Sequence, residues 1–290
     1  MPMKRNLLIL LGVMLALPTF ARDFTYKYEG QTLVYTVIDE DSKTVRTKNG
    51  SDLTTTPGNK VSGEVIIPSV VYDENNVAYT VTEIGSYGFK ECLRLTSVII
   101  PNTVTLIGDG AFFNSENLAS LTIPNSVVTI GKGICSFNVA LTSIVIPESV
   151  STIGDGAFSY CSKLNTVWLP GSLTSLGEIT FSDSYSVKSV YYNTEEPVTA
   201  YKNIFSVLKA YDRAVLYVPS EAAIEKCKKT SPWMYFYDIQ VYDFSQSDVN
   251  EILSDEDSGE LPMYDLYGRK VVNPQRGQIY IKGGKKFIQN

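Results

Sequence analysis

The sequence of 290 residues contains no histidine. Without imidazole side chains the chain cannot build Ser-His-Asp or Cys-His catalysis, histidine-ligated zinc, or acid–base chemistry based on histidine. Its 25 basic and 31 acidic residues give a net charge of -6, which argues against a nucleic-acid binder or a ligand of anionic membranes. The hydrophobic content of 44% excludes wholesale disorder, because it provides ample material for a core.

Long hydrophobic runs are absent after the first residues of the chain. Lys4 and Arg5 precede an apolar run from Leu7 to Leu17, and the small residue Ala21 follows. A run of this length is too short to span a bilayer, which needs about 20 residues. The order of basic, apolar and small residues predicts a secretory signal peptide over residues 1–21. We therefore expect an exported protein, secreted or held at the cell surface, with no transmembrane span in the mature chain.

Three columns of residues recur every 23 positions in the middle of the chain. The recurring residues are the pairs Ile84-Gly85, Ile107-Gly108, Ile130-Gly131, Ile153-Gly154 and Leu176-Gly177, the prolines Pro101, Pro124, Pro147 and Pro170, and the leucines Leu95, Leu118, Leu141 and Leu164, with Val187 in the same column. Three columns that keep one phase over four periods identify a repeat array. A unit this short cannot bury its own apolar face, so neighbouring units must stack and share a core.

Each unit contains a Leu-x-x-apolar-x-apolar-Pro segment. The alternation predicts a strand with one buried face, and proline then ends the strand because it has no N–H to donate. We expect seven strands in one parallel sheet, centred near residues 65, 98, 121, 144, 167, 190 and 216. The glycine column supplies a turn that a Cβ would hinder. Phenylalanines are expected to fill the interior on the return leg of the coil: Phe89, Phe112, Phe158 and Phe181.

These columns resemble the BspA-type leucine-rich repeat family of bacterial surface proteins, with the segment from Ile153 to Cys161 as the clearest copy. The resemblance covers residues 61–192. It implies an α/β-type but β-rich repeat fold, a right-handed leucine-rich-repeat solenoid capped at both ends, and adhesion to host extracellular proteins or to other cells. The chain departs from the general leucine-rich pattern because proline, not asparagine, follows the strand, and the third unit has Ile134-Cys135 where Ala-Phe is expected.

The segments on either side of the array are expected to cap it. Residues 22–60 alternate apolar and polar side chains and predict a β-hairpin cap, which resembles the N-terminal cap of this family. Residues 193–242 are assigned to an irregular last repeat and a C-terminal cap. In that cap we expect a short helix from Ser220 to Lys229. Trp233, Phe236 and Ile239 are expected to seal the last coil.

The tail changes the sign of its charge. Residues 243–261 carry seven acids and no base, which predicts a solvated acidic linker. Residues 262–290 carry six bases against Asp265 alone and predict a small β segment. That segment resembles a C-terminal sorting signal of exported proteins in one Gram-negative phylum. A structural module that only ends the chain is the alternative.

The residues that could carry chemistry are few. Cys92 and Cys161 occupy equivalent positions three repeats apart, so at about 4.8 Å per strand they lie roughly 14 Å apart, too far for a disulfide. We interpret them, with Cys135 and Cys227, as buried thiols. No cysteine spacing suits a metal cluster, and no carboxylate pair is marked as glycosidase machinery. The sequence therefore favours a protein that is not an enzyme and that uses no cofactor or metal.

The concave face of the solenoid remains as the candidate binding surface. Residues that flank the central apolar position of each strand point away from the core. They form a hydroxyl column and a second column that becomes aromatic: Ser97, Ser120, Ser143, Thr166 and Ser189, then Ile99, Thr122, Val145, Trp168, Tyr191 and Tyr217. The hydroxyl column can donate and accept hydrogen bonds. Trp168, Tyr191 and Tyr217 are expected to form an exposed aromatic stripe.

Aromatic residues are enriched at protein interfaces and they also stack on sugars. The first interpretation is a host extracellular or cell-surface protein as partner, in adhesion to matrix or to other cells, with no nucleic-acid partner. A glycan-binding module that uses the aromatic stripe is the alternative. A purely structural surface component is the third interpretation, because strands favour aromatic and β-branched residues on any account.

Overall fold

The computed structural model describes residues 22–50, 61–201, 203–205 and 211–245, together with four short strands near the C-terminus. The predicted signal peptide, residues 1–21, lies outside the described residues. So does most of the predicted acidic linker, of which residues 243–245 are described.

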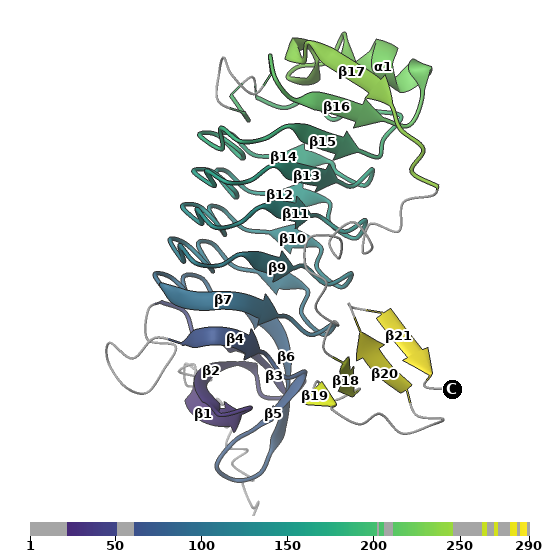
Figure 1. The fold of residues 1–290 in the computed structure, drawn as a ribbon. Coiled ribbons are helices and arrows are strands. Elements are labelled where there is room, and N and C mark those ends of the chain that lie inside the picture. The colour runs from purple at the N-terminus through teal and green to yellow at the C-terminus, as the bar shows by residue number, and fades with distance from the viewer. Residues whose placement is uncertain are drawn as a thin grey trace, which may run out of the picture.

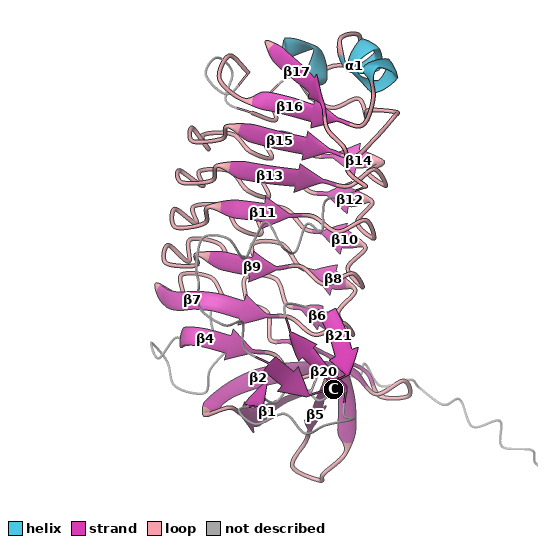
Figure 2. Ribbon diagram, turned by 45° about the vertical axis from the view of Figure 1, so that its right-hand side comes forward, coloured by secondary structure: helices cyan, strands magenta, loops and turns pink. Residues whose placement is uncertain are grey.

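The described chain winds into a solenoid in which each turn contributes one strand to a front sheet (Figures 1 and 2). The front strands are β4 (Ser62–Ile66), β7 (Arg94–Ile99), β9 (Ser120–Thr122), β11 (Ser143–Val145), β13 (Thr166–Leu169), β15 (Ser189–Tyr192), β16 (Val215–Val218) and β17 (Asp238–Val241). Their pairings are parallel, in two hydrogen-bonded groups that meet where β9 lies beside β11. The prediction of a parallel sheet at these seven centres is confirmed, and within the described residues β17 adds a further strand.

A second parallel sheet runs along the back of the solenoid (Figure 2). Its repeat strands are β6 (Ala78–Ile84), β8 (Leu106–Ile107), β10 (Thr129–Ile130), β12 (Thr152–Ile153) and β14 (Ser175–Leu176). The expectation of one sheet was therefore incomplete. Most of these strands are two residues long, so they carry no alternation that a sequence could show, and they exist because stacking brings equivalent residues into register.

The glycine column allows the coils to approach each other at the end of each back strand. A Cβ built on Gly154 would lie 2.7 Å from the carbonyl carbon of Gly131 and 2.7 Å from the nitrogen of Lys132. Gly131 and Gly177 meet the backbone of the preceding coil in the same way. The backbone of Gly154 does not have positive φ, so close approach between coils, and not turn conformation, is what excludes a side chain here.

Strands from the N-terminal segment continue the back sheet. β1 (Asp23–Tyr28), β2 (Gln31–Asp39) and β3 (Thr44–Thr47) pair in antiparallel order, and β3 then pairs in parallel with β6. This cap contains the expected hairpin and one strand more. The short strand β5 (Val70–Tyr72) lies between β4 and β6 in the chain and pairs antiparallel with β6.

A short helix and a last strand cover the C-terminal coil. Helix α1 (Glu221–Cys227) begins after Ser220, whose hydroxyl accepts a hydrogen bond from the backbone N–H of Ala223 at 3.1 Å. The 3-10 helix η1 (Trp233–Tyr235) follows, and β17 pairs with β16. Trp233 is fully buried, and its indole N–H donates to the carbonyl of Val198 at 2.7 Å.

Buried columns hold the coils together between the two sheets. In the phenylalanine column Phe89 stacks on Phe112, Phe158 stacks on Phe181, and Phe181 stacks on Phe205, with centroid distances of 5.1 to 5.6 Å. A second column contains Cys92, Ser115, Asn138, Cys161 and Ser184. Its polar members bind the coil before them: the backbone N–H of Ser115 donates to Asn138 at 2.8 Å, and that of Cys161 donates to Ser184 at 3.1 Å.

The C-terminal segment forms a four-stranded antiparallel sheet in the order β19-β18-β20-β21. Its strands are β18 (Met263–Asp265), β19 (Lys270–Val271), β20 (Ile279–Lys282) and β21 (Lys285–Ile288). These strands lie within residues 262–290, for which the sequence predicts a small β segment. The sorting role remains a prediction.

Candidate binding site

The expected hydroxyl column lies on the outer face of the front sheet. Ser97 pairs with Ser120, Ser143 with Thr166, and Thr166 with Ser189, so the side chains stand in one row across the strands. All five are at least partly exposed. Beyond Ser189 the row continues as Val215 and Asp238, and the hydroxyl character ends there.

The aromatic stripe, defined as Trp168, Tyr191 and Tyr217, stands beside this row. Strand pairing places the three side chains in register on β13, β15 and β16. Their rings stack face to face, Trp168 on Tyr191 at 3.9 Å and Tyr191 on Tyr217 at 4.6 Å between centroids, with interplanar angles of 6° and 12°. Stacking along the sheet turns the ring faces toward each other, so the stripe offers mainly ring edges to a ligand.

The expectation that the whole stripe is exposed was wrong at Trp168, which is 4% exposed although it points away from the core. Residues 242–245, called the strap below, follow β17 and return over the stripe. Tyr242 meets Trp168, Tyr191 and Tyr217 edge to face at 5.8, 4.9 and 5.9 Å, and Phe244 meets Trp168 at 6.1 Å and 90°. Figure 1 shows the chain running from β17 back toward the level of β15 and β13.

The same cover affects the chemistry of Tyr191. Burial raises the pKa of its phenol, and the neighbouring Tyr217 and Tyr242 hydroxyls add to the rise. The strap falls at the boundary where the sequence pattern placed the start of the acidic linker. The signal that could have found it is the pair Tyr242-x-Phe244, two aromatic residues with the spacing of one strand face.

A second aromatic surface was not predicted from the sequence. This edge patch, Phe113, Phe137 and Tyr160, lies in the turns that connect back strands to front strands. Phe137 stacks on Tyr160 at 4.4 Å and 4°, and Phe113 meets Phe137 at 5.5 Å and 61°. Phe137 and Tyr160 are 38% and 44% exposed.

The backbone makes the edge patch unusual. Phe137 and Tyr160 have φ of 65° and 58°, a region that bulky residues rarely adopt. The equivalent positions one coil before and after hold Asn114 and Asp183, which tolerate this conformation. Two aromatic residues in a column that otherwise holds polar residues were the signal in the sequence.

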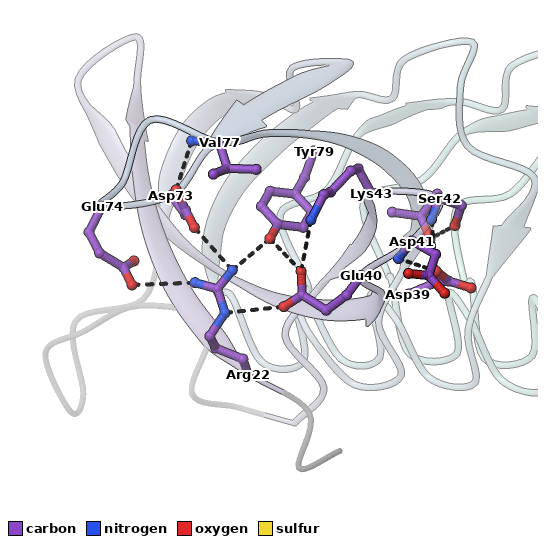
Figure 3. A network of polar contacts seen from close by, with 11 residues as sticks. Arg22, Asp39, Glu40, Asp41, Ser42, Lys43, Asp73, Glu74, Val77 and Tyr79 are labelled. Carbon is purple, nitrogen blue, oxygen red and sulfur yellow. Dashed lines mark hydrogen bonds and ion pairs between the residues drawn. The ribbon is translucent and has the colours of Figure 1, made fainter. Parts of the chain in front are cut away.

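A group of ionisable side chains in mutual contact lies in the N-terminal cap (Figure 3). Arg22 donates to Asp73 at 3.0 Å, to Tyr79 at 2.7 Å, to Glu74 at 3.3 Å and to Glu40 at 3.4 Å, and the Tyr79 hydroxyl donates to Glu40 at 2.7 Å. Burial alone would raise the pKa of Asp73, but hydrogen bonds from the Val77 N–H and from Arg22 hold it below its ordinary value. These groups satisfy one another and join β1, the β2–β3 turn and the β5–β6 turn, as a structural tie would.

The four cysteines are buried and none forms a disulfide with another. Burial raises the pKa of Cys161 and of Cys227 to about 12, so neither thiol ionises readily near neutral pH. In the part of the chain that the structure describes, no group of three or more cysteine and acidic side chains is placed to hold a metal ion. None of the helices seen among those residues has the length and hydrophobicity required to cross a bilayer.

The repeat region matches a known family. The model of the BspA type leucine rich repeat region matches six copies over residues 82–209. This region consists of BspA-type leucine-rich repeats. The family resemblance carried by the 23-residue columns is thereby confirmed for the repeat region.

Three solved structures show what this chain is similar to. A leucine-rich repeat protein of T. pallidum is 27% identical, with a TM-score of 0.47 over 55% of this chain and 68% of that one. A leucine rich cell surface protein of Faecalibacterium prausnitzii is 26% identical, with a TM-score of 0.46 over 68% of this chain and 55% of that one, so this chain spans about half of its length. A leucine-rich repeat protein of Bacteroides ovatus is 23% identical, with a TM-score of 0.44 over 74% of this chain and 67% of that one. Comparison with curated proteins gives no significant match.

Proposed function

We propose that this chain is an exported leucine-rich-repeat protein of the cell surface that binds a protein partner through its front sheet. The partner is a host extracellular or cell-surface protein, and the activity is adhesion. Support for export comes from the pattern of residues 1–21 and from the BspA-type repeats. No catalytic step is part of the proposal, and the polar network of Arg22, Asp73, Tyr79 and Glu40 is interpreted as a structural tie.

One observation carries the choice of surface. Trp168, Tyr191 and Tyr217 stand in register on the outer face with a row of hydroxyls beside them. Tyrosine and tryptophan combine a large apolar area with a polar group, and such residues dominate binding energy at protein interfaces. A broad sheet with an aromatic centre and a polar margin suits a folded protein partner.

Glycan binding is the second candidate, and the ring geometry makes it weaker. Sugar rings stack on exposed aromatic faces, whereas the faces of Tyr191 are covered by Trp168 on one side and by Tyr217 on the other. A glycan would have to use the hydroxyl row and the ring edges. The observation that favours keeping this candidate is the unbroken row from Ser143 to Ser189.

The test compares two aromatic surfaces of the same chain. The full chain is applied to arrays of extracellular-matrix proteins and of glycans, beside the variants Tyr191→Ala/Tyr217→Ala and Phe137→Ala/Tyr160→Ala. We expect binding to a matrix protein that weakens about tenfold or more in the front-sheet variant, the effect of losing an interface hot spot, and that is unchanged in the edge-patch variant. Loss only in the edge-patch variant would move the site to the turns. Binding to glycans alone would favour the second candidate, and two blank arrays would favour a structural component.

A further inference from the structure

The strap shows what kind of group the aromatic stripe accepts. Tyr242 lies across all three rings of the stripe, and Phe244 lies against Trp168 and against Tyr242 at 5.0 Å and 77°. All of these contacts are edge to face or nearly so, which is a favourable arrangement for aromatic pairs. The stripe therefore already holds two aromatic side chains of an extended segment.

The backbone explains how one short segment delivers both rings. The N–H of Tyr242 donates to the carbonyl of Val218 at 2.8 Å, which continues the alignment of β17 with β16 for one residue. The carboxylate of Asp243 then accepts from the N–H of Ser245 at 3.0 Å and from its hydroxyl at 2.6 Å. This is an Asx-turn, and it bends the chain directly after Phe244.

Burial differs between Trp168 in the stripe and the two aromatic residues of the strap. Trp168 is almost fully buried, yet it does not belong to the core that fills the solenoid, so its cover comes from outside the coil. Tyr242 and Phe244 remain partly exposed. Water therefore reaches the strap while the ring beneath it is shielded, as expected for a peptide lying on a binding surface.

We propose that the aromatic stripe is a binding site for an extended peptide segment with aromatic side chains at positions i and i+2, and that Tyr242-Asp243-Phe244 occupies it in this structure. A partner segment binds by replacing the strap, which places its own two rings on Trp168, Tyr191 and Tyr217. This inference rests on the proposed function, because it names the ligand chemistry of the same surface. The attachment of the strap to β17 gives it a high effective concentration, so the strap weakens every competing ligand.

The two tryptophans of the chain allow a direct test. Trp233 is buried in the terminal cap, and in the variant Trp168→Phe it gives the whole tryptophan fluorescence. Subtracting the fluorescence of this variant from that of the parent chain leaves the signal of Trp168. In the full chain, Tyr242→Ala/Phe244→Ala should raise acrylamide quenching of Trp168 severalfold and shift its emission to the red. Tyr237→Ala, at an exposed position in the same cap, is the matched control and should change neither.

The probe is a synthetic peptide with the sequence of residues 238–245. This peptide should bind the strap variant Tyr242→Ala/Phe244→Ala and bring the acrylamide quenching of Trp168 back to the level of the unmodified chain. It should bind the unmodified chain at least tenfold more weakly. A peptide with both aromatic residues replaced by alanine should not bind. Unchanged quenching in the strap variant would overturn the inference. The inference would also be overturned if Trp168 is uncovered in the strap variant but the peptide does not bind. The same holds if lower stability of the variant is what uncovers Trp168.

The outcome is separable from that of the proposed function. If the peptide does not bind but the chain still binds a matrix protein through Tyr191 and Tyr217, only this inference is refuted. Peptide exchange that succeeds while matrix and glycan arrays are blank supports the site and removes the adhesion proposal.

Discussion

The glycine that follows each back strand allows a test of why glycine is needed there: close approach between coils or a left-handed backbone conformation. Gly154→Ala places a Cβ 2.7 Å from the carbonyl carbon of Gly131. Carbon atoms that are not bonded prefer 3.5–4.0 Å, so the two coils must separate by about 0.8 Å. Backbone atoms cannot rotate away, and the displacement acts on the hydrogen bonds between the coils.

Two hydrogen bonds cross this contact. The N–H of Gly154 donates to the carbonyl of Ile130 at 2.9 Å, and the N–H of Gly133 donates to the carbonyl of Asp155 at 2.9 Å. Lengthening either by about 0.8 Å exceeds hydrogen-bond distance. An unmade buried hydrogen bond costs about 1–3 kcal/mol, so Gly154→Ala should lower the free energy of unfolding by about 2–6 kcal/mol.

The matched control is Gly133→Ala, one coil earlier. Gly133 has φ of 56°, and a Cβ at this position would have the Cβ of Ser136 as its nearest neighbour, at 3.8 Å. The left-handed backbone alone costs roughly 1–2 kcal/mol for a residue with a Cβ. Equilibrium urea unfolding of both variants measures the difference. If Gly154→Ala destabilises the chain no more than Gly133→Ala, the argument from close approach is refuted.

Two further predictions concern the core and the N-terminal cap. Phe158→Ala removes a fully buried ring of the phenylalanine column, so it should lower the free energy of unfolding in urea by about 3–5 kcal/mol. Phe137→Ala in the edge patch removes a partly exposed ring and should lower it by under about 1 kcal/mol. Equal losses in the two variants would contradict the assigned burial. The pKa of Asp73 lies below its ordinary value of 3.8 in the folded chain, so its contribution to stability is present above that pH and is lost as the pH falls through the lower folded value. Between pH 7 and pH 3, the free energy of unfolding should therefore fall less in Asp73→Asn than in the parent chain. The control variant Asp212→Asn, at an exposed position, should lose as much as the parent chain. Equal pH dependence in all three chains would show that the Asp73 network does not stabilise the fold.

Much of the fold follows from local sequence. The columns that contain Leu95, Val98 and Ile100 predict one buried strand face per coil, because alternation requires only neighbouring residues. Equivalent positions in a repeat must then stack in register, which is why the rows from Ser97 to Ser189 and from Trp168 to Tyr217 are correct as rows. Helix α1 was also predictable, since its N-cap at Ser220 is a local signal.

The back sheet required the tertiary structure. Its strands at residues such as Leu106 and Ile107 are too short to show a pattern, and they form only when coils stack. The reason for glycine in that region was also not local. At Gly154 the neighbouring coil, and not the conformation of the residue itself, decides which side chain fits.

The sequence by itself determined which residues face outward on each strand, because side chains alternate along a strand whatever surrounds it. It placed Trp168 on the outer face, and Trp168 lies there. Only the tertiary structure decided that Trp168 is buried. Burial depends on what comes to lie on a surface, and Tyr242 and Phe244, which cover Trp168, come from the segment after β17, three strands further along the front sheet.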